Sequence, residues 1–292
     1  MLDFIAFGEI LFDCFPDGRA TLGGAPLNCA GHMSRLGLEG YMLSAVGDDE
    51  LGKRALKEIS ALGMSTAHIQ VLEKAETGRA DIKLVGKNAD YTFNDPAAWD
   101  LVKAEERPEK ARLVYFGTLS QRKEQSRSAL LRLLEDAEPE DVFFDVNLRK
   151  DFYSKDIILR GLEAATILKM NDEEVPVVLS FAGITATGRE ALSLLSTKYG
   201  LRAVLVTEGK KGTSCLSGGR WHHEDIHDVP VTDTVGAGDS LSAGFLATLL
   251  LTGDVGKAVR VGSTLADYVV TQRGAIPEYS ENLKEFLKSE GL

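Results

Sequence analysis

The sequence Asp233-Thr-Val-Gly-Ala-Gly-Asp-Ser-Leu-Ser-Ala-Gly-Phe245 joins a glycine-containing segment to a stretch with helical periodicity. Gly236 and Gly238 precede a run whose apolar residues recur at helical spacing, namely Leu241, Phe245, Leu246, Leu249 and Leu250. This pattern predicts a loop that opens into a buried helix. The first N–H groups of such a helix are unpaired and lie at the positive end of its dipole, and glycine lets a ligand approach them closely. We therefore predict an anion site, suited to phosphate, at Gly236, Ala237 and Gly238.

Asp239 places a carboxylate at the mouth of this predicted anion site. An aspartate in a first helical turn is favourable for the helix dipole, so a purely structural role explains it as well. Beside a phosphoryl group, the same carboxylate serves as a general base that takes the proton from an attacking hydroxyl. Helix statistics alone leave both interpretations open.

The composition limits the class of protein. The chain has 292 residues, 44% of them hydrophobic, which suits one large globular domain, and we assign residues 1–292 to a single domain with one insertion. The formal net charge of -11 argues against nucleic acid as a partner, because phosphate backbones attract basic surfaces. The three cysteines form no CxxC pair, no basic leader precedes Glu9, and no apolar run reaches ~18 residues. These features predict a cytoplasmic protein without a membrane partner.

Short apolar runs alternate with helix-like stretches along most of the chain. Phe4–Phe7 is a continuous apolar run, as found in strands that are buried on both faces. Further strands are predicted at 113–116, 142–144, 166–168 and 203–206, and helices at 126–137, 155–165, 172–180 and 189–198. Repeated strand and helix over this length predict an α/β fold with a doubly wound, mostly parallel sheet and helices on both faces.

The periodicity changes between about residues 69 and 95. Ala80, Ile82 and Leu84 alternate with polar residues, and Gly86-Lys-Asn88 supplies a turn before the next apolar residues. We predict a β-hairpin with one polar face, inserted at approximately 69–95 and joined by a contribution from 11–22. Such a small β lid covers a site, forms a homodimer contact, or does both.

Polar residues gather immediately after the predicted strands. Asp13 follows the first strand, and Gly23-Gly24-Ala-Pro-Leu-Asn28 opens a helix whose glycine pair and asparagine suit a polyol ligand. Three later strands are followed by the clusters Asp145-Val-Asn147-Leu-Arg149, Lys169-Met-Asn171-Asp-Glu-Glu174 and Thr207-Glu-Gly209-Lys-Lys-Gly212. Because ligands of open α/β sheets bind at the carboxyl edge of the strands, we expect these segments to form one site.

The segment His223-Glu-Asp-Ile-His227 matches the HExxH zinc motif. That chemistry needs a helix, so that both histidines share one face. The stretch from Trp221 to Val231 is predicted to be a strand that enters the glycine loop. On a strand, with a rise of ~3.3 Å per residue, the two histidines would lie ~13 Å apart, too far to share one metal. We therefore set zinc hydrolysis aside.

With these segments, the chain resembles the ribokinase-like, or phosphofructokinase B, family of sugar kinases over essentially its whole length. Gly23–Asn28 is similar to the family's N-terminal signature, and Asp233–Ser240 is similar to its C-terminal one. Further matches are the NxxE element at Asn171 and Glu174, the loop before the nucleotide at Thr207–Gly212, and the tail Arg273-Gly-Ala-Ile-Pro277. The order and spacing of these segments together make the resemblance specific.

The resemblance implies ATP-dependent phosphorylation of a sugar hydroxyl. Asp239 is then the base, and the anion hole is formed by Gly236, Ala237 and Gly238. The sugar is held by Asp13, Gly23, Gly24, Asn28, Asn147 and Asp239, and ATP by Asn171, Thr207, Gly209, Gly212, Gly236 and Gly238. Mg²⁺ is organised, through water, by Asn171 and Glu174. The resemblance also implies a site for a monovalent cation, with K⁺ as the expected ion, at Asp233, Val235 and Gly274.

Four segments resemble fructokinase-type members, namely Gly8–Asp13, Ala98–Asp100, Phe116–Arg122 and Asp145–Arg149. Arg149 is then a catalytic candidate that acts on the charge of substrate or phosphate; otherwise it is a surface arginine paired with a nearby acid. The DxNxR element is also similar to 2-keto-3-deoxygluconate kinases, so that sugar acid, ribose and nucleosides remain alternative acceptors. A catalytically silent sugar-binding regulatory protein is an alternative of another class, against which the intact base and glycine loop argue.

Overall fold

The computed structural model describes residues 1–85, 88–105 and 108–292. Its large sheet has nine strands in the order β13-β12-β11-β10-β9-β8-β1-β4-β5. The strands from β5 to β11 run parallel, and β12 and β13 are antiparallel additions at one edge. Their bounds are β1 Leu2–Phe7, β4 Gly40–Gly47, β5 Ile69–Leu72, β8 Ala111–Gly117, β9 Asp141–Asp145, β10 Ile167–Asn171, β11 Ala203–Thr207, β12 Thr213–Ser217 and β13 Arg220–Glu224. The mostly parallel sheet predicted from the sequence is confirmed.

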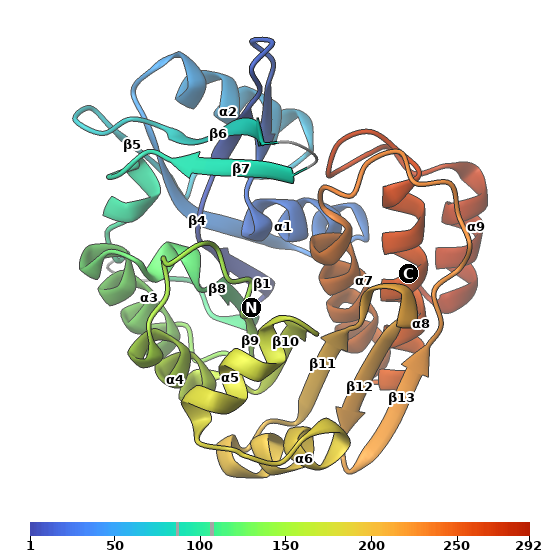
Figure 1. Ribbon diagram of the computed structural model, residues 1–292. Coiled ribbons are helices and arrows are strands. Elements are labelled where there is room, and N and C mark those ends of the chain that lie inside the picture. Colours follow the sequence, from blue (N-terminus) through green and yellow to red (C-terminus); the bar gives the residue numbers. More distant parts are fainter. Residues whose placement is uncertain (86–87, 106–107) are drawn as a thin grey trace.

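Helices cover both faces of this sheet, as Figure 1 shows. One face carries α1 Ala25–Arg35, α2 Glu50–Ala61, α7 Ala237–Thr252, α8 Val255–Val270 and α9 Glu281–Glu290. The other carries α3 Glu124–Asp136, α4 Lys155–Ala164, α5 Glu174–Ala182 and α6 Gly188–Tyr199. A hydrophobic core lies on each face of the sheet, and alternate residues of β1 point into the two cores. Phe4 and Ala6 belong to the first core, and Ile5 and Phe7 belong to the second. A doubly wound α/β fold is therefore confirmed.

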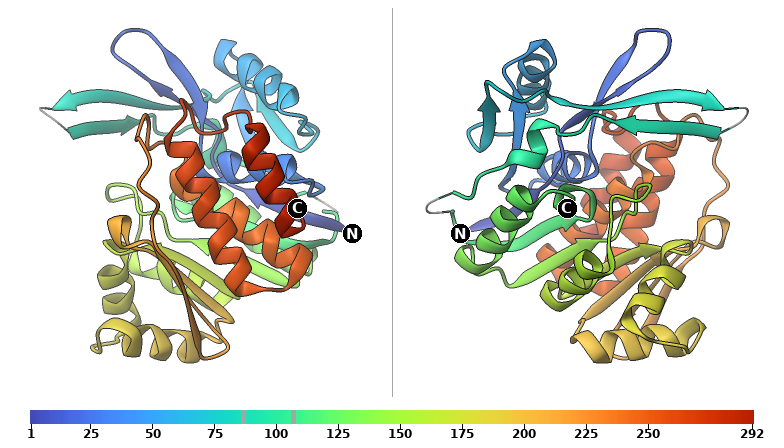
Figure 2. Two further views of the ribbon diagram at one scale, coloured as in Figure 1. Left: turned by 90° about the vertical axis from the view of Figure 1, so that its right-hand side faces the viewer. Right: turned by 60° about the vertical axis from the view of Figure 1, so that its left-hand side comes forward.

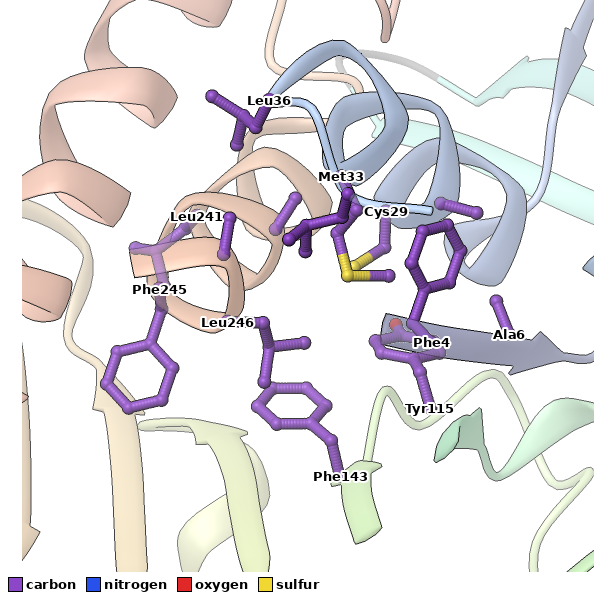
Figure 3. Close-up of a cluster of buried hydrophobic side chains, with 14 of the residues drawn as sticks. Phe4, Ala6, Cys29, Met33, Leu36, Tyr115, Phe143, Leu241, Phe245 and Leu246 are labelled. Carbon is purple, nitrogen blue, oxygen red and sulfur yellow. The ribbon is translucent and has the colours of Figure 1, made fainter. Parts of the chain in front are cut away.

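Helix α7 is anchored deep in the first core (Figure 3). Every residue from Ser240 to Leu249 is buried. Leu241, Phe245 and Leu246 pack in a cluster with Met33 and other side chains of α1 and the sheet. A fully buried side chain of this size contributes about 1.5–3 kcal/mol to folding. The amino end of α7 is thus attached to a rigid support, which suits a helix that has to present its first turn to a ligand.

A second sheet lies above the large one (Figures 1 and 2). Its strand order is β3-β2-β6-β7, with bounds Ala20–Gly23, Leu11–Cys14, Gly78–Val85 and Asn88–Phe93. The insertion predicted at 69–95 also contains β5, which the structure places in the large sheet next to β4. Of the turn predicted at Gly86-Lys-Asn88, the first two residues lie outside the described residues, and Asn88 begins β7. The segment 11–22 supplies β2 and most of β3.

The strand predicted from Trp221 to Val231 is shorter than expected. β13 ends at Glu224, and the chain then runs to α7 without regular structure. His223 therefore lies on a strand and His227 beyond it, where His227 Nδ1 is 2.6 Å from Asp267. Neither histidine is on a helix, so the geometry that the HExxH motif requires is not formed.

In the described ranges, no helix is both long and apolar enough to cross a lipid bilayer.

Candidate active site

The strand register brings the predicted polar clusters to one edge of the large sheet. Asn171 at the end of β10 pairs with Thr207 at the end of β11. Lys169 pairs with Asp145, the last residue of β9, which in turn pairs with Gly117 of β8. The strand order reverses at β1, whose neighbours β4 and β8 lie on opposite sides. Ligands of open α/β sheets bind at the carboxyl edge near such a reversal.

The amino end of α7 is formed by the predicted glycine loop. Gly236 is the N-cap residue and has a φ of 80°, a conformation that only glycine adopts without strain. A Cβ at this position would also lie 2.6 Å from the Cβ of Ala275, so the packing excludes any side chain. At Gly238, a Cβ would lie 3.3 Å from the ammonium nitrogen of Lys169. Because residue 238 has no side chain, the buried ammonium group of Lys169 lies directly beside the predicted anion site.

Asp239 faces a residue from a distant part of the chain. The side-chain amide of Asn28, on α1, donates a hydrogen bond of 2.7 Å to its carboxylate. The pKa of Asp239 is raised to about 6, mainly by burial and also by the carboxylate of Asp145. The hydrogen bond from Asn28 and the charges of Lys169 and Arg149 act in the opposite direction. A carboxyl group with this pKa is ionised at neutral pH and still basic enough to accept a proton.

Two further acids lie close enough to Asp239 for its charge to raise their pKa values. Glu9 lies two residues after the end of β1 and is buried, and burial is the main cause that raises its pKa to about 7. Asp13 is half-buried on β2, where burial likewise raises its pKa to about 6. The positive charge of Arg149 lowers the pKa of Glu9, Asp13 and Asp239 alike, although its side chain is exposed. Arg149 is thus a counter-charge common to three carboxyl groups, which the sequence alone did not reveal.

A buried ion pair lies behind the glycine loop. The ammonium group of Lys169 is 3.0 and 3.1 Å from the two carboxylate oxygens of Asp145, and both side chains are buried. The hydroxyl of Tyr115 donates to the same carboxylate at 3.0 Å. Burial alone would lower the pKa of Lys169, but the carboxylates of Asp145, Glu174 and Asp239 outweigh it and keep the lysine charged. In the sequence, Lys169 belongs to a polar cluster and no role is assigned to it, although a lysine inside a buried strand needs such a partner.

Asn171 and Glu174 form a local hydrogen-bonded unit. The carboxylate of Glu174 accepts the N–H of Leu148 at 2.8 Å and that of Asn171 at 2.9 Å. The Asn171 side-chain oxygen accepts the N–H of Glu174 at 2.8 Å. Both side chains therefore brace the end of β10 against the segment that carries Asn147, a residue with a left-handed φ of 38°. Since these oxygens are already engaged, the arrangement fits a Mg²⁺ ion held by nucleotide phosphates and reached by Glu174 through water.

The predicted monovalent cation residues lie together. The carboxylate of Asp233 accepts the N–H of Val235 at 3.1 Å and that of Gly274 at 3.3 Å. All three line a cavity of about 500 Å³, to which Asp13 and Arg273 also contribute. The remaining predicted nucleotide residues lie at the same edge of the sheet, where Thr207 ends β11, Gly209 begins the short 3-10 turn that follows and Gly212 caps it. No group of three His, Cys, Asp or Glu side chains in the described ranges is arranged to hold a metal ion by itself.

A predicted anion site beside a carboxyl group that can accept a proton is the arrangement expected of a phosphotransferase on an α/β fold. The chain belongs to the pfkB family of carbohydrate kinases, whose family model matches residues 14–282. It is therefore an ATP-dependent carbohydrate kinase, as the resemblance implied.

Similar proteins support this assignment. A fructokinase of Salmonella typhimurium is 28% identical over 261 residues, which cover 84% of this chain and 84% of that protein. The crystal structure of a Vibrio cholerae fructokinase with bound fructose, ADP and calcium ion has a TM-score of 0.86 and 23% identity, covering 98% of this chain and 99% of that one. An aminoimidazole riboside kinase from Salmonella enterica, complexed with aminoimidazole riboside and an ATP analog, has a TM-score of 0.83 and 21% identity, covering 98% and 99%. These structures share the fold with this chain.

Proposed function

We propose that this chain transfers the γ-phosphoryl group of ATP to a hydroxyl of a fructose-like sugar, with Asp239 as the general base. The observation that supports this role is the position of Asp239, which is held by Asn28 in the first turn of α7 beside Gly236 and Gly238. The acceptor hydroxyl loses its proton to Asp239 as its oxygen bonds to phosphorus and the bond to the ADP oxygen breaks. The amides of Gly236, Ala237 and Gly238 stabilise the charge on the transferring phosphoryl group.

The other residues bind and orient in this mechanism. The acceptor sugar is bound by Asp13, Gly23, Gly24, Asn28 and Asn147. The nucleotide is bound by Asn171, Thr207, Gly209 and Gly212. Arg149 and Lys169 supply positive charge near the site of transfer, from the exposed and the buried side respectively. When bound with ATP, Mg²⁺ neutralises phosphate charge. Asn171 and Glu174 would hold this ion through its water ligands.

A polyol acceptor is supported by two buried oxygens in the site. Within the described part of the chain, one carboxylate oxygen of Glu9 and the side-chain oxygen of Asn28 are buried and make no hydrogen bond. Buried acceptors of this kind are normally satisfied, and sugar hydroxyls supply the missing donors. We therefore add Glu9 to the residues proposed to contact the acceptor.

An acceptor screen tests this proposal directly. Purified protein with Mg²⁺ and ATP is offered fructose, glucose, ribose, 2-keto-3-deoxygluconate and adenosine, and ADP release is followed by a coupled assay. We expect the highest kcat/KM with fructose. A preference for 2-keto-3-deoxygluconate, ribose or a nucleoside would keep the chemistry and change the acceptor. ATP binding without turnover on any of them would favour the regulatory alternative.

The rate is expected to depend on pH through Asp239. Because the pKa of Asp239 in the ligand-free protein is about 6 and the ionised form is the base, we expect kcat/KM for the acceptor to fall roughly tenfold per pH unit below about 6 and to be constant above about 7. Initial rates at low acceptor concentration and saturating ATP, from about pH 5 to about pH 9, check this expectation. Asp13 and Glu9 titrate in the same range, so the same profile is measured for Asp13→Asn and Glu9→Gln, in which the limb from Asp239 should remain. A flat kcat/KM profile between about pH 5 and about pH 7 would contradict the assignment of the base.

Cation use and assembly follow from the same site and lid. A double mutant of the Vibrio cholerae fructokinase is described in a fructose, ADP and potassium ion bound form. We propose that Asp233, Val235 and Gly274 hold K⁺ here as well. Comparing the phosphorylation rate in KCl with the rate in tetramethylammonium chloride tests this site.

The small sheet offers edges for assembly. Its outer strands are β3 and β7, and such edges can pair with a second copy in a homodimer. We further propose a cytoplasmic location.

A further inference from the structure

Helix α1 carries two polar side chains, one turn apart, that hydrogen-bond to Asp239 and to a residue packed against Gly236. Asn28 donates to the carboxylate of Asp239 at 2.7 Å. His32 lies one turn further along α1, and residues at this spacing share one face of a helix. Its Nε2 atom is 2.8 Å from the carbonyl oxygen of Ala275, a residue packed against Gly236. The helix that carries the proposed acceptor residue Asn28 thus also contacts the segment behind the anion hole.

Burial and hydrogen bonding together define the state of His32. A carbonyl oxygen only accepts, so Nε2 carries the hydrogen that is donated to Ala275. The side chain is fully buried, and burial lowers its pKa to about 4, so the imidazole is neutral at physiological pH. Nδ1 then accepts from the hydroxyl of Tyr279 at 2.7 Å. The carbonyl group of Ala275 thus selects the tautomer, and Tyr279 orients the ring.

The segment from Gly274 to Pro277 has little freedom to move away from α1. A Cβ at Gly31 would lie 2.6 Å from the terminal methyl carbon of Ile276, so helix and segment are in close contact. Arg35, one turn after Gly31, donates to the carbonyl oxygen of Pro277. On the far side, a Cβ at Gly236 would lie 2.6 Å from the Cβ of Ala275. A shift of Ala275 would therefore be transmitted to the first residue of the anion hole.

We propose that His32 is a positioning residue for phosphoryl transfer. By holding the carbonyl group of Ala275, it keeps Gly236 at a fixed distance from Asn28 and Asp239, and so keeps the anion hole aligned with the acceptor hydroxyl. This inference rests on the proposed roles of Asp239 and Gly236. It matters for rate because a misplacement of about 1 Å between reacting groups can reduce a rate on the order of 100-fold.

Three substitutions separate the donor function of His32 from its bulk. His32→Leu keeps an apolar side chain and removes the donor, and we expect kcat to fall between about 10-fold and about 100-fold, with a smaller change in the KM of the acceptor. His32→Gln places an N–H near the position of Nε2, and we expect it to restore most of kcat. Tyr279→Phe removes only the hydroxyl that orients the imidazole, and we expect a decrease in the same direction that is smaller than that of His32→Leu.

The matched control is Tyr268→Phe. The hydroxyl of Tyr268 donates to the carbonyl oxygen of Glu278 at 2.6 Å, so it binds the same tail at a point that does not touch Gly236. We expect this variant to retain the kcat of the unmodified enzyme. Thermal unfolding of every variant identifies the temperature range in which each is folded, and kcat is compared only there. If His32→Leu does not fold, the kcat values of His32→Gln, Tyr279→Phe and Tyr268→Phe decide whether His32 positions the anion hole. A loss in Tyr279→Phe with none in Tyr268→Phe supports the inference.

Two results would overturn the inference. One is an unchanged kcat in folded His32→Leu; the other is an equal loss in Tyr279→Phe and Tyr268→Phe, which would indicate a general effect on the tail. Either result leaves the proposed function intact if the unmodified enzyme phosphorylates its acceptor and Asp239→Asn does not. Full activity in Asp239→Asn would instead show that Asp239 is not the general base, whatever the result for the His32 variants.

Discussion

Replacing Asp239 by asparagine is expected to reduce kcat by at least about 100-fold while the acceptor still binds. Asparagine keeps the shape of the side chain and an oxygen that Asn28 can donate to, but it cannot take a proton from the acceptor hydroxyl. The rate follows from a coupled ADP assay, and acceptor binding from isothermal titration calorimetry. An acceptor affinity close to that of the unmodified enzyme would show that the loss lies in the chemical step.

Asp254→Asn is the matched control for this experiment. Asp254 also stands at the start of a helix, where its side chain accepts the N–H of Lys257 at 2.9 Å as the N-cap of α8. Asparagine caps a helix about as well as aspartate, so we expect this variant to keep its activity. If Asp239→Asn were as active as Asp254→Asn, the purely structural, helix-dipole interpretation of Asp239 would be correct and the proposed base would be wrong.

Replacing Lys169 by methionine is expected to destabilise the fold by about 3–5 kcal/mol. The substitution leaves Asp145 buried without its ion-pair partner, while the hydroxyl of Tyr115 still donates to it. The double variant Lys169→Met/Asp145→Asn removes both charges, and we expect it to recover most of the lost stability. Urea unfolding at neutral pH measures the free energy of unfolding of each variant.

An exposed ion pair provides the comparison for Lys169. Lys110 and Glu138 are 2.6 Å apart, with side chains that are 58% and 66% exposed. We expect Lys110→Met to change the free energy of unfolding by less than about 1 kcal/mol, because water screens such a pair. Equal effects of Lys169→Met and Lys110→Met would mean that the charge of Lys169 is solvated or that Asp145 is neutral in the folded protein.

The helices and strands of the α/β region could be predicted from local patterns. The run Phe4–Phe7 lies in β1, and the predicted helix at 155–165 corresponds to α4, because core burial imposes a period on nearby residues. The glycine loop before α7 was equally visible, since Gly236 has a conformation that few other residues adopt. The start of β13 was found but its end was not, because no local signal marks the residue at which pairing with β12 stops.

Contacts between distant residues could not be predicted in this way. Asn28 and Asp239 are 211 positions apart, and the hydrogen bond between them depends on how α1 and α7 pack. The pairing of β5 with β4 likewise depends on sheet order rather than on the sequence of β5. Glu9, Lys169 and His32 went without a role, although each is a polar residue within or next to an apolar stretch. A charged or polar residue in such a place requires a partner, and this was the available signal.

The distribution of the site along the chain has a consequence for biosynthesis. Asn28 and His32 are translated long before Asp239 and Tyr279, their hydrogen-bonding partners. A ribosome-bound chain that has released α1 therefore contains His32 and the acceptor-binding residue Asn28 before their partners exist. We expect fragments that stop short of Tyr279 to be catalytically inert, so that kinase activity reports on synthesis having passed this point.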